Sequence, residues 1–183
     1  MPPSFMIQTR RLQLLPLNEA QLKLYTEPDN ALERSLDLAL FPRMVPDELK
    51  EAFDQLILPN VADSSRNYLF STVWNIIDKD QNRMVGDLCF KGEPNQEGAV
   101  EIGYGTYPDC QNRGYMSEAV GSLCAWALQQ PGVATVLAET DNHNIPSHRT
   151  LEKNGFLPFR HTETMTWWRL ERKESRESDE SIL

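Results

Sequence analysis

Gln111-Asn112-Arg113-Gly114-Tyr115-Met116 decides how this sequence is interpreted, because it joins an expected strand at 99–107 to an expected helix that runs to about residue 129. A strand-to-helix turn leaves backbone N–H groups free at the positive end of the helix dipole, where pyrophosphate can bind. Gly114 lets the backbone approach a ligand without a Cβ atom. Arg113 adds planar charged donors. Alone, this turn predicts only a phosphate-bearing ligand, since helix starts without ligands are far commoner.

A second informative segment covers residues 138–156. Its order of residues predicts a strand, an Asn-rich turn, a short helix and a glycine stop. Asn144 suits the N-cap, Pro146 suits the first helical turn, and Gly155 suits the left-handed position after the helix. The segment therefore predicts one more strand and one more helix after the expected helix that runs to about residue 129.

Together the two segments resemble the coenzyme A signature of the GNAT superfamily of N-acetyltransferases. Within that superfamily they are most similar to the RimJ/RimL-like branch, whose members acetylate protein N-termini or small amines. The match spans about residues 5–170 and is weakest over 19–68. The family turn usually ends in Gly or Ala, where this chain has Met116. The matching segments are Glu101-Ile102-Gly103-Tyr104, then Gln111-x-x-Gly114-Tyr115-x-Ser117-Glu118-Ala119, then Asn144-x-x-Ser147-x-x-x-Leu151-x-Lys153-x-Gly155-Phe156.

The resemblance implies an α/β (α+β) fold with a mixed, mostly antiparallel sheet of about seven strands and helices on both faces. Acetyl-CoA would be the cosubstrate, bound in a V between two splayed central strands, and no metal is expected. The amine would enter from the opposite side, against the 18–60 helices and a turn at 159–163. The coenzyme would contact Ile102, Gly103, Tyr104, Gln111, Asn112, Arg113, Gly114, Tyr115, Met116, Asn144 and Ser147.

Two residues are candidate catalysts by this resemblance. Glu101 would act as a general base, directly or through water, and Ser147 would protonate the departing thiolate. Gly103 and Gly105 suggest a bulge that splays the strand. Glu101 is alternatively a solvent-facing strand residue or the partner of a nearby cation, and Ser147 is alternatively a first-turn residue bonded to the local backbone.

Composition is that of an ordinary globular protein. The chain has 183 residues, with 40% hydrophobic and 25% charged residues, which suits one domain over residues 1–170. The charged segment 171–183 has almost no apolar surface and is expected to be a disordered tail. The net charge of −9 disfavours nucleic acid. It favours a cationic acceptor, such as an amine or a basic protein N-terminus.

No apolar run approaches the roughly 20 residues that span a bilayer, and residues 1–5 do not resemble a signal peptide. Three widely spaced cysteines suggest neither disulfides nor a zinc site. We therefore expect a cytoplasmic protein without a membrane partner, as a monomer or homodimer.

The remaining pattern predicts strands at 7–17, 68–77, 84–90, 133–140 and 162–170, and helices at 19–25, 31–39 and 47–58. The expected function is direct acetyl transfer to a primary amine in a ternary complex. A non-catalytic acyl-CoA-binding module or sensor is the alternative. A dinucleotide-binding domain is disfavoured, because no Gly-x-Gly-x-x-Gly follows the first strand.

Overall fold

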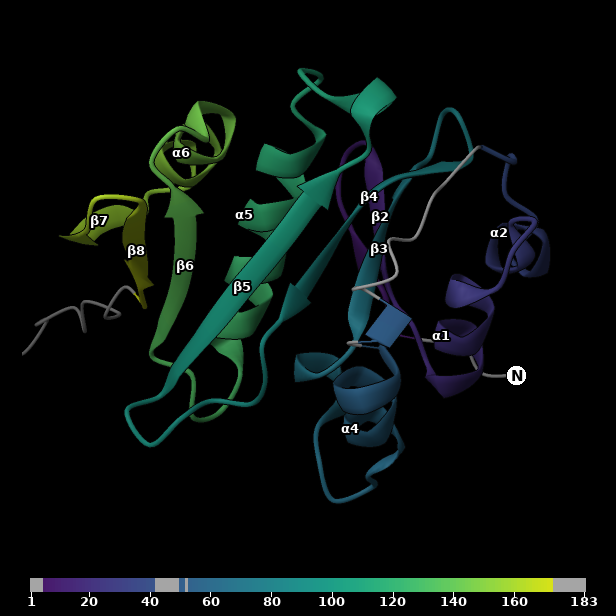
Figure 1. Ribbon diagram of the computed structural model, residues 1–183, viewed down its shortest axis with the longest axis horizontal. Helices are drawn as coiled ribbons and strands as arrows, with labels where there is room; N and C mark the ends of the chain where they lie inside the picture. The colour runs from purple at the N-terminus through teal and green to yellow at the C-terminus, as the bar shows by residue number, and fades with distance from the viewer. Residues whose placement is uncertain (1–4, 42–49, 52, 173–183) are drawn as a thin grey trace, which may run out of the picture.

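The computed structural model describes residues 5–41, 50–51 and 53–172. Its centre is a sheet of strands in the order β1-β2-β3-β4-β5-β6-β8-β7 (Figure 1). Every neighbouring pair is antiparallel except β5 and β6, which are parallel. The strands are β1 (Ile7–Gln8), β2 (Leu12–Pro16), β3 (Val73–Asp78), β4 (Arg83–Phe90), β5 (Ala99–Thr106), β6 (Thr135–Asp141), β7 (Leu157–His161) and β8 (Met165–Glu171).

The helices begin largely where the capping residues predict. Asn18 caps the first helix, accepting from the Gln21 N–H in a reciprocal capping box, and Asn144 caps the last by accepting from the Ser147 N–H. The α-helices are α1 (Glu19–Thr26), α2 (Ala31–Ser35), α4 (Leu58–Ala62), α5 (Tyr115–Gln129) and α6 (Ile145–Lys153). Short turns are π-helical at Phe53–Ile57 and 3₁₀ at Tyr68–Phe70 and Pro108–Cys110. In the described part of the chain, no helix is long and apolar enough to cross a membrane.

Part of the predicted 47–58 helix lies outside the described residues, and the described part from 53 is the π-helical turn. The predicted 68–77 strand is shorter than expected, because its first residues form the 3₁₀ turn before β3. The second helix ends at Ser35, four residues before the predicted end.

Apolar side chains pack against both faces of the sheet. Leu12 and Leu14 of β2 join the cluster that α5 covers, whereas Leu15 packs with α1 and α2 on the other face. This follows from the two-residue repeat of a strand and confirms helices on both faces. The predicted apolar stripe of α5 is buried against the sheet, namely Met116, Ala119, Val120, Leu123 and Ala127.

The sheet has eight strands rather than about seven. Residues 9–11 interrupt the predicted first strand, because the chain turns there and β1 pairs back on β2. The second difference is β7, which was predicted in part as a turn at 159–163. It forms because β8 offers it a partner, with Leu157 opposite Arg169 and His161 opposite Thr166.

The central strands β5 and β6 diverge as predicted. They pair only from Ala99 to Glu101, opposite Thr135 to Leu137, and beyond that α5 is visible in the gap between them (Figure 1). The expected bulge at Gly103 and Gly105 is wrong, because the pairing of β5 with β4 continues without a shift from Ile102 to Thr106. The strands separate because β5 continues along β4 while β6 continues along β8.

The folded chain continues past residue 170. Glu171 pairs with Thr135, and the Arg172 guanidinium donates to the carbonyls of Gln130 and Val133 at 2.8 and 2.5 Å. Residues 173–183 of the predicted tail lie outside the described residues.

Candidate active site

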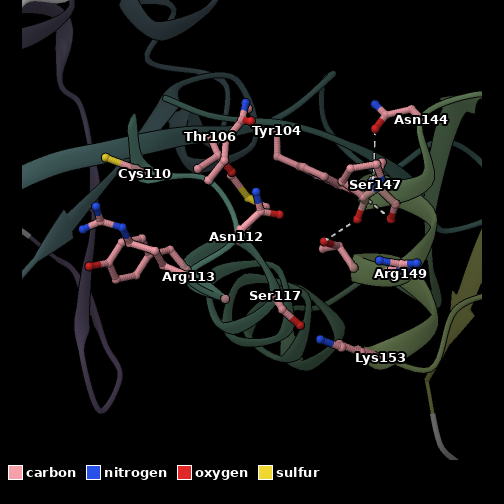
Figure 2. Close-up of a pocket in the computed structure, with 17 residues that line it drawn as sticks. Tyr104, Thr106, Cys110, Asn112, Arg113, Ser117, Asn144, Ser147, Arg149 and Lys153 are labelled. Carbon is pink, nitrogen blue, oxygen red and sulfur yellow. Dashed lines mark hydrogen bonds between the residues drawn. The ribbon is translucent and has the colours of Figure 1, made fainter. Parts of the chain in front are cut away.

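A pocket of about 550 Å³ opens where β5, the start of α5 and the start of α6 meet (Figure 2). Three segments far apart in sequence form it, and each contributes polar groups. Most of the predicted coenzyme-binding residues line it. The lining consists of Tyr104, Gly105, Thr106, Cys110, Gln111, Asn112, Arg113, Gly114, Tyr115, Met116, Ser117, Asn144, Pro146, Ser147, Arg149, Thr150 and Lys153.

The turn before α5 has a backbone that suits an anion site. Asn112 and Gly114 are both left-handed, with φ of 60° and 75°. Asn and Gly are the residues that adopt this conformation most readily. Gly114 is the N-cap and provides no side-chain cap, so the first-turn N–H groups remain available to a ligand.

Ser147 and Tyr104 form a hydrogen-bonded pair at the other end of the pocket. The two hydroxyl oxygens lie 2.7 Å apart, and Asn144 Oδ1 accepts from the Ser147 N–H at 3.2 Å (Figure 2). Burial raises the pKa of Tyr104 to about 12. Tyr104 therefore stays protonated at neutral pH and can donate to Ser147.

Arg149 and Lys153 bring cationic side chains into the pocket from α6. Neither was predicted to bind the coenzyme, although Lys153 belongs to the matching pattern. A usable signal was present, because Pro146, Arg149 or Thr150, and Lys153 recur at the three- to four-residue spacing of one helix face. The exposed Arg113 side chain lies at the opposite end of the pocket from these two cations (Figure 2).

Glu101 lies outside this pocket, at the point where β5 and β6 part. It is the last β5 residue that pairs with β6, opposite Leu137. Its carboxylate forms an ion pair with Lys91 through Oε1, and the carboxylate of Glu139 lies 3.9 Å from the same ammonium. The hydrogen bond to Glu101 is the main cause that raises the pKa of Lys91. A nearby cation is thus a partner of Glu101, as one reading of the sequence expected.

Ile102 and Gly103 also lie outside the pocket lining. Ile102 is buried in the core that α5 covers. Gly103 lies on the same face of the strand as Glu101, where a Cβ atom would be 3.4 Å from Cys89 Sγ. Among the described residues, no group of three or more His, Cys, Asp or Glu side chains could hold a metal ion.

These observations first define a class: an α/β protein whose sheet opens between two parallel strands beside a helix start suited to an anion. Residues 11–157 match the acetyltransferase (GNAT) domain family, so the chain belongs to that family.

Curated relatives match only part of the chain. The uncharacterized N-acetyltransferase YjdG of Bacillus subtilis (strain 168) is 38% identical over 84 residues, which are 46% of this chain and 50% of the relative. YnaD, an uncharacterized N-acetyltransferase of the same organism, is 30% identical over 80 residues, or 44% and 46% of the two chains. The chain thus spans about half the length of the curated relatives it matches.

Solved structures share the fold over nearly the whole chain. The ribosomal-protein-S5-alanine acetyltransferase of Vibrio fischeri has a TM-score of 0.69 at 14% identity, covering 93% of this chain and 98% of its own. The spermidine N-acetyltransferase of Vibrio cholerae, solved with CoA and spermine, has a TM-score of 0.62 at 14% identity, covering 90% and 97%. At such identities the likeness shows the fold alone.

Proposed function

We propose that this protein is an acetyl-CoA-dependent N-acetyltransferase that transfers an acetyl group to a primary amine by direct attack in a ternary complex. The observation that carries the proposal is the convergence of three features at one opening. A helix start with free N–H groups, a Tyr104–Ser147 hydroxyl pair and the part of β5 beyond its last pairing with β6 all line this pocket.

The donor would bind with its pyrophosphate at the 111–116 turn, where backbone N–H groups and the helix dipole favour negative charge. Arg149 and Lys153 line the same pocket and supply full positive charges for phosphate groups. Asn144 and Ser147 stand where the chain of the coenzyme would run on toward the gap between β5 and β6. The thioester would then lie near the Ser147 hydroxyl.

Ser147 is proposed as the acid. The amine nitrogen attacks the thioester carbonyl carbon, a C–N bond forms, and the C–S bond breaks with its electron pair on sulfur. The thiolate takes the Ser147 hydroxyl proton while Tyr104 donates to the same oxygen at 2.7 Å, and Ser147 then regains a proton from water. Since Tyr104 keeps its own proton near neutral pH, it lowers the cost of negative charge on Ser147.

Glu101 is proposed as the base on the opposite face of β5. Lys91 holds Oε1, which leaves Oε2 to accept the proton that the amine loses, directly or through water. An α-amine with a pKa of about 7.8 needs only about 1 kcal/mol to lose its proton at pH 7, whereas a lysine-type amine needs roughly 4.6 kcal/mol. A single carboxylate is therefore an adequate base for an α-amine.

The acceptor is proposed to be a protein N-terminal α-amine or a small amine. Two fold neighbours are described as a ribosomal-protein-alanine acetyltransferase and a spermidine acetyltransferase, which supports an amine without choosing between these kinds. The net charge of −9 favours a cationic acceptor by long-range steering. Free thiols at Cys89, Cys110 and Cys124 support a reducing, cytoplasmic setting. The protein would act there as a monomer or homodimer.

One observation favours a second function. The Lys91 ammonium pairs with Oε1 of Glu101, and a cation beside a carboxylate makes it a weaker base. A non-catalytic acyl-CoA-binding module or sensor is therefore the alternative.

Turnover of acetyl-CoA with a panel of N-terminal peptides and small amines, followed by mass detection, separates the two functions. In the enzyme, Glu101→Gln lowers the rate near pH 7 by roughly 10²-fold. The rate of this variant recovers partly at high pH, because the amine deprotonates there unaided. The recovery is larger for an α-amine than for a lysine-type amine.

Glu139→Gln is the matched control, because it removes the other carboxylate beside Lys91 without touching the proposed base. Equal pH–rate profiles for Glu101→Gln and wild type would assign the base elsewhere. Coenzyme binding without turnover of any amine would favour the sensor.

A further inference from the structure

Arg11 contacts the coenzyme turn, residues 111–116, without lining the pocket itself. It lies in the break between β1 and β2, about a hundred residues before the turn, and is not among the pocket residues. Its Nη1 donates to the Arg113 carbonyl at 3.0 Å, and its guanidinium lies 5.0 Å from the centre of the Tyr115 ring. A Cβ atom on Gly114 would lie 3.5 Å from Arg11 Nη2.

Glu118, in the first turns of α5, fixes the guanidinium in this place. Its Oε2 accepts from Arg11 Nε at 2.7 Å, and its Oε1 accepts from the Arg11 N–H at 3.0 Å and from the Thr9 hydroxyl at 2.6 Å. Partial burial opposes ionisation, but the bonds from Thr9 and Arg11 outweigh it and lower the pKa of Glu118. The carboxylate is therefore ionised at neutral pH.

The bond from Arg11 to the turn has a geometric consequence for the ligand. A trans peptide directs its C=O and N–H to opposite sides. With the Arg113 carbonyl held toward Arg11, the N–H of Gly114 points away from Arg11. The Gly114 N–H is then oriented before any anion arrives. Binding loses less conformational entropy when the hydrogen-bond donor is already oriented.

We propose that Arg11 is a positioning residue for the coenzyme, held by Glu118, which keeps the turn in the conformation that receives a diphosphate group. This inference rests on the proposed placement of the coenzyme at residues 111–116. It extends the site to a side chain that touches neither the ligand nor the reacting atoms.

A purely structural role, docking the β1–β2 turn on α5, would use many of the same contacts. Thr9 separates the two roles, because its hydroxyl donates to Glu118 and accepts from the Leu12 N–H at 2.8 Å, with no bond to the coenzyme turn. Thr9→Val thus removes one bond to Glu118 and the bond to Leu12, and leaves the bonds of the Arg11 guanidinium to Glu118 and Arg113 in place. Arg11→Lys keeps the charge but lacks the planar fork that serves Glu118 and the Arg113 carbonyl together.

The experiment compares the dissociation constants of two ligands, coenzyme A and pantetheine, measured by calorimetry or competition on the full chain. Pantetheine lacks the diphosphate. We expect Arg11→Lys to weaken coenzyme A binding about tenfold, which corresponds to about 1.4 kcal/mol, and to leave pantetheine binding unchanged. Thr9→Val lowers the melting temperature without changing the ratio of the two constants. Glu118→Gln should shift the ratio in the same direction as Arg11→Lys. It serves as the test variant if Arg11→Lys does not fold.

An equal loss for both ligands, or an unchanged ratio in Arg11→Lys and Glu118→Gln, would overturn the positioning role. The measurement does not depend on turnover, so the role of Arg11 is decided even if the protein proves to be a sensor. Failure of the wild type to bind coenzyme A would refute the proposed placement and this inference together.

Discussion

Removing the Tyr104 hydroxyl tests whether Tyr104 assists Ser147, the proposed acid. Tyr104→Phe keeps the ring that packs against the α5 core and deletes only the group that lies 2.7 Å from Ser147 Oγ. Since Ser147 is only 9% exposed, little water replaces the lost partner. The variant therefore isolates one hydrogen bond at the proposed site of proton delivery.

The expected size follows from the burial of the pair. Losing one partner of a buried hydrogen bond costs about 1–3 kcal/mol. If about 1–2 kcal/mol of this is lost specifically in the transition state, kcat falls about 5- to 30-fold. Because burial raises the pKa of Tyr104 to about 12, the phenol is protonated throughout the assay range. The reduction should therefore be the same from about pH 6 to pH 10.

The assay is a double-mutant cycle on kcat with Tyr104→Phe, Ser147→Ala and the double variant, with coenzyme A affinity measured in parallel. Tyr104 acts through Ser147 in this reasoning, so the double variant should be no slower than Ser147→Ala alone. Ser147→Ala should also show no rescue at high pH, because thiolate protonation becomes no easier there. If the two substitutions lower kcat by independent factors that multiply in the double variant, Tyr104 does not act through Ser147. An effect of Tyr104→Phe on coenzyme affinity alone would also refute that role.

Two stability predictions rest on other contacts. For Asp78, burial opposes ionisation, but hydrogen bonds from Tyr115 and the backbone N–H groups of Gln81 and Asp80 lower its pKa. The stabilisation is thus complete well above its ordinary pKa of about 3.9 and is lost as pH falls through the folded value. The melting temperature of Asp78→Asn should lie below that of wild type at pH 7, and the gap should close as the pH falls below about 4; a constant gap would contradict this. Gly86→Ala should destabilise by about 1–3 kcal/mol, because its Cβ would lie 2.5 Å from the Gly105 carbonyl oxygen. Gly105→Ala is its control, since nothing lies within 4 Å of the added atom; equal urea midpoints would contradict the clash.

Local signals in the sequence predicted the elements that carry the site. Asn144 caps α6 and Gly155 is left-handed with φ of 81°, as their residue types indicate. The strand-to-helix turn at residues 111–116 and the buried stripe of α5 were predicted for the same reason. Each depends on neighbours within about four positions, so the chain itself specifies it.

Pairing between segments that are distant in sequence was harder to predict from the sequence. The edge strand β7 is exposed at all of its residues, so it lacks the alternation of apolar and polar residues that marks a half-buried strand. It is a strand because β8 supplies its hydrogen bonds. The sequence predicted the divergence of β5 and β6 but attributed it to a bulge. The pairing of β5 with β4 shows no bulge, and the two strands separate because β5 follows β4 while β6 follows β8.

The sequence by itself determined the family, and the caps and the apolar stripe of the helices that border the pocket. Only the tertiary structure decided which side chains meet. Tyr104 meets Ser147 across 43 positions, and Arg11 meets Glu118 across 107. The physical reason is that a hydrogen bond depends on distance and direction in space. Those are set by how β5, α5 and α6 pack on one sheet, and no spacing along the chain records them.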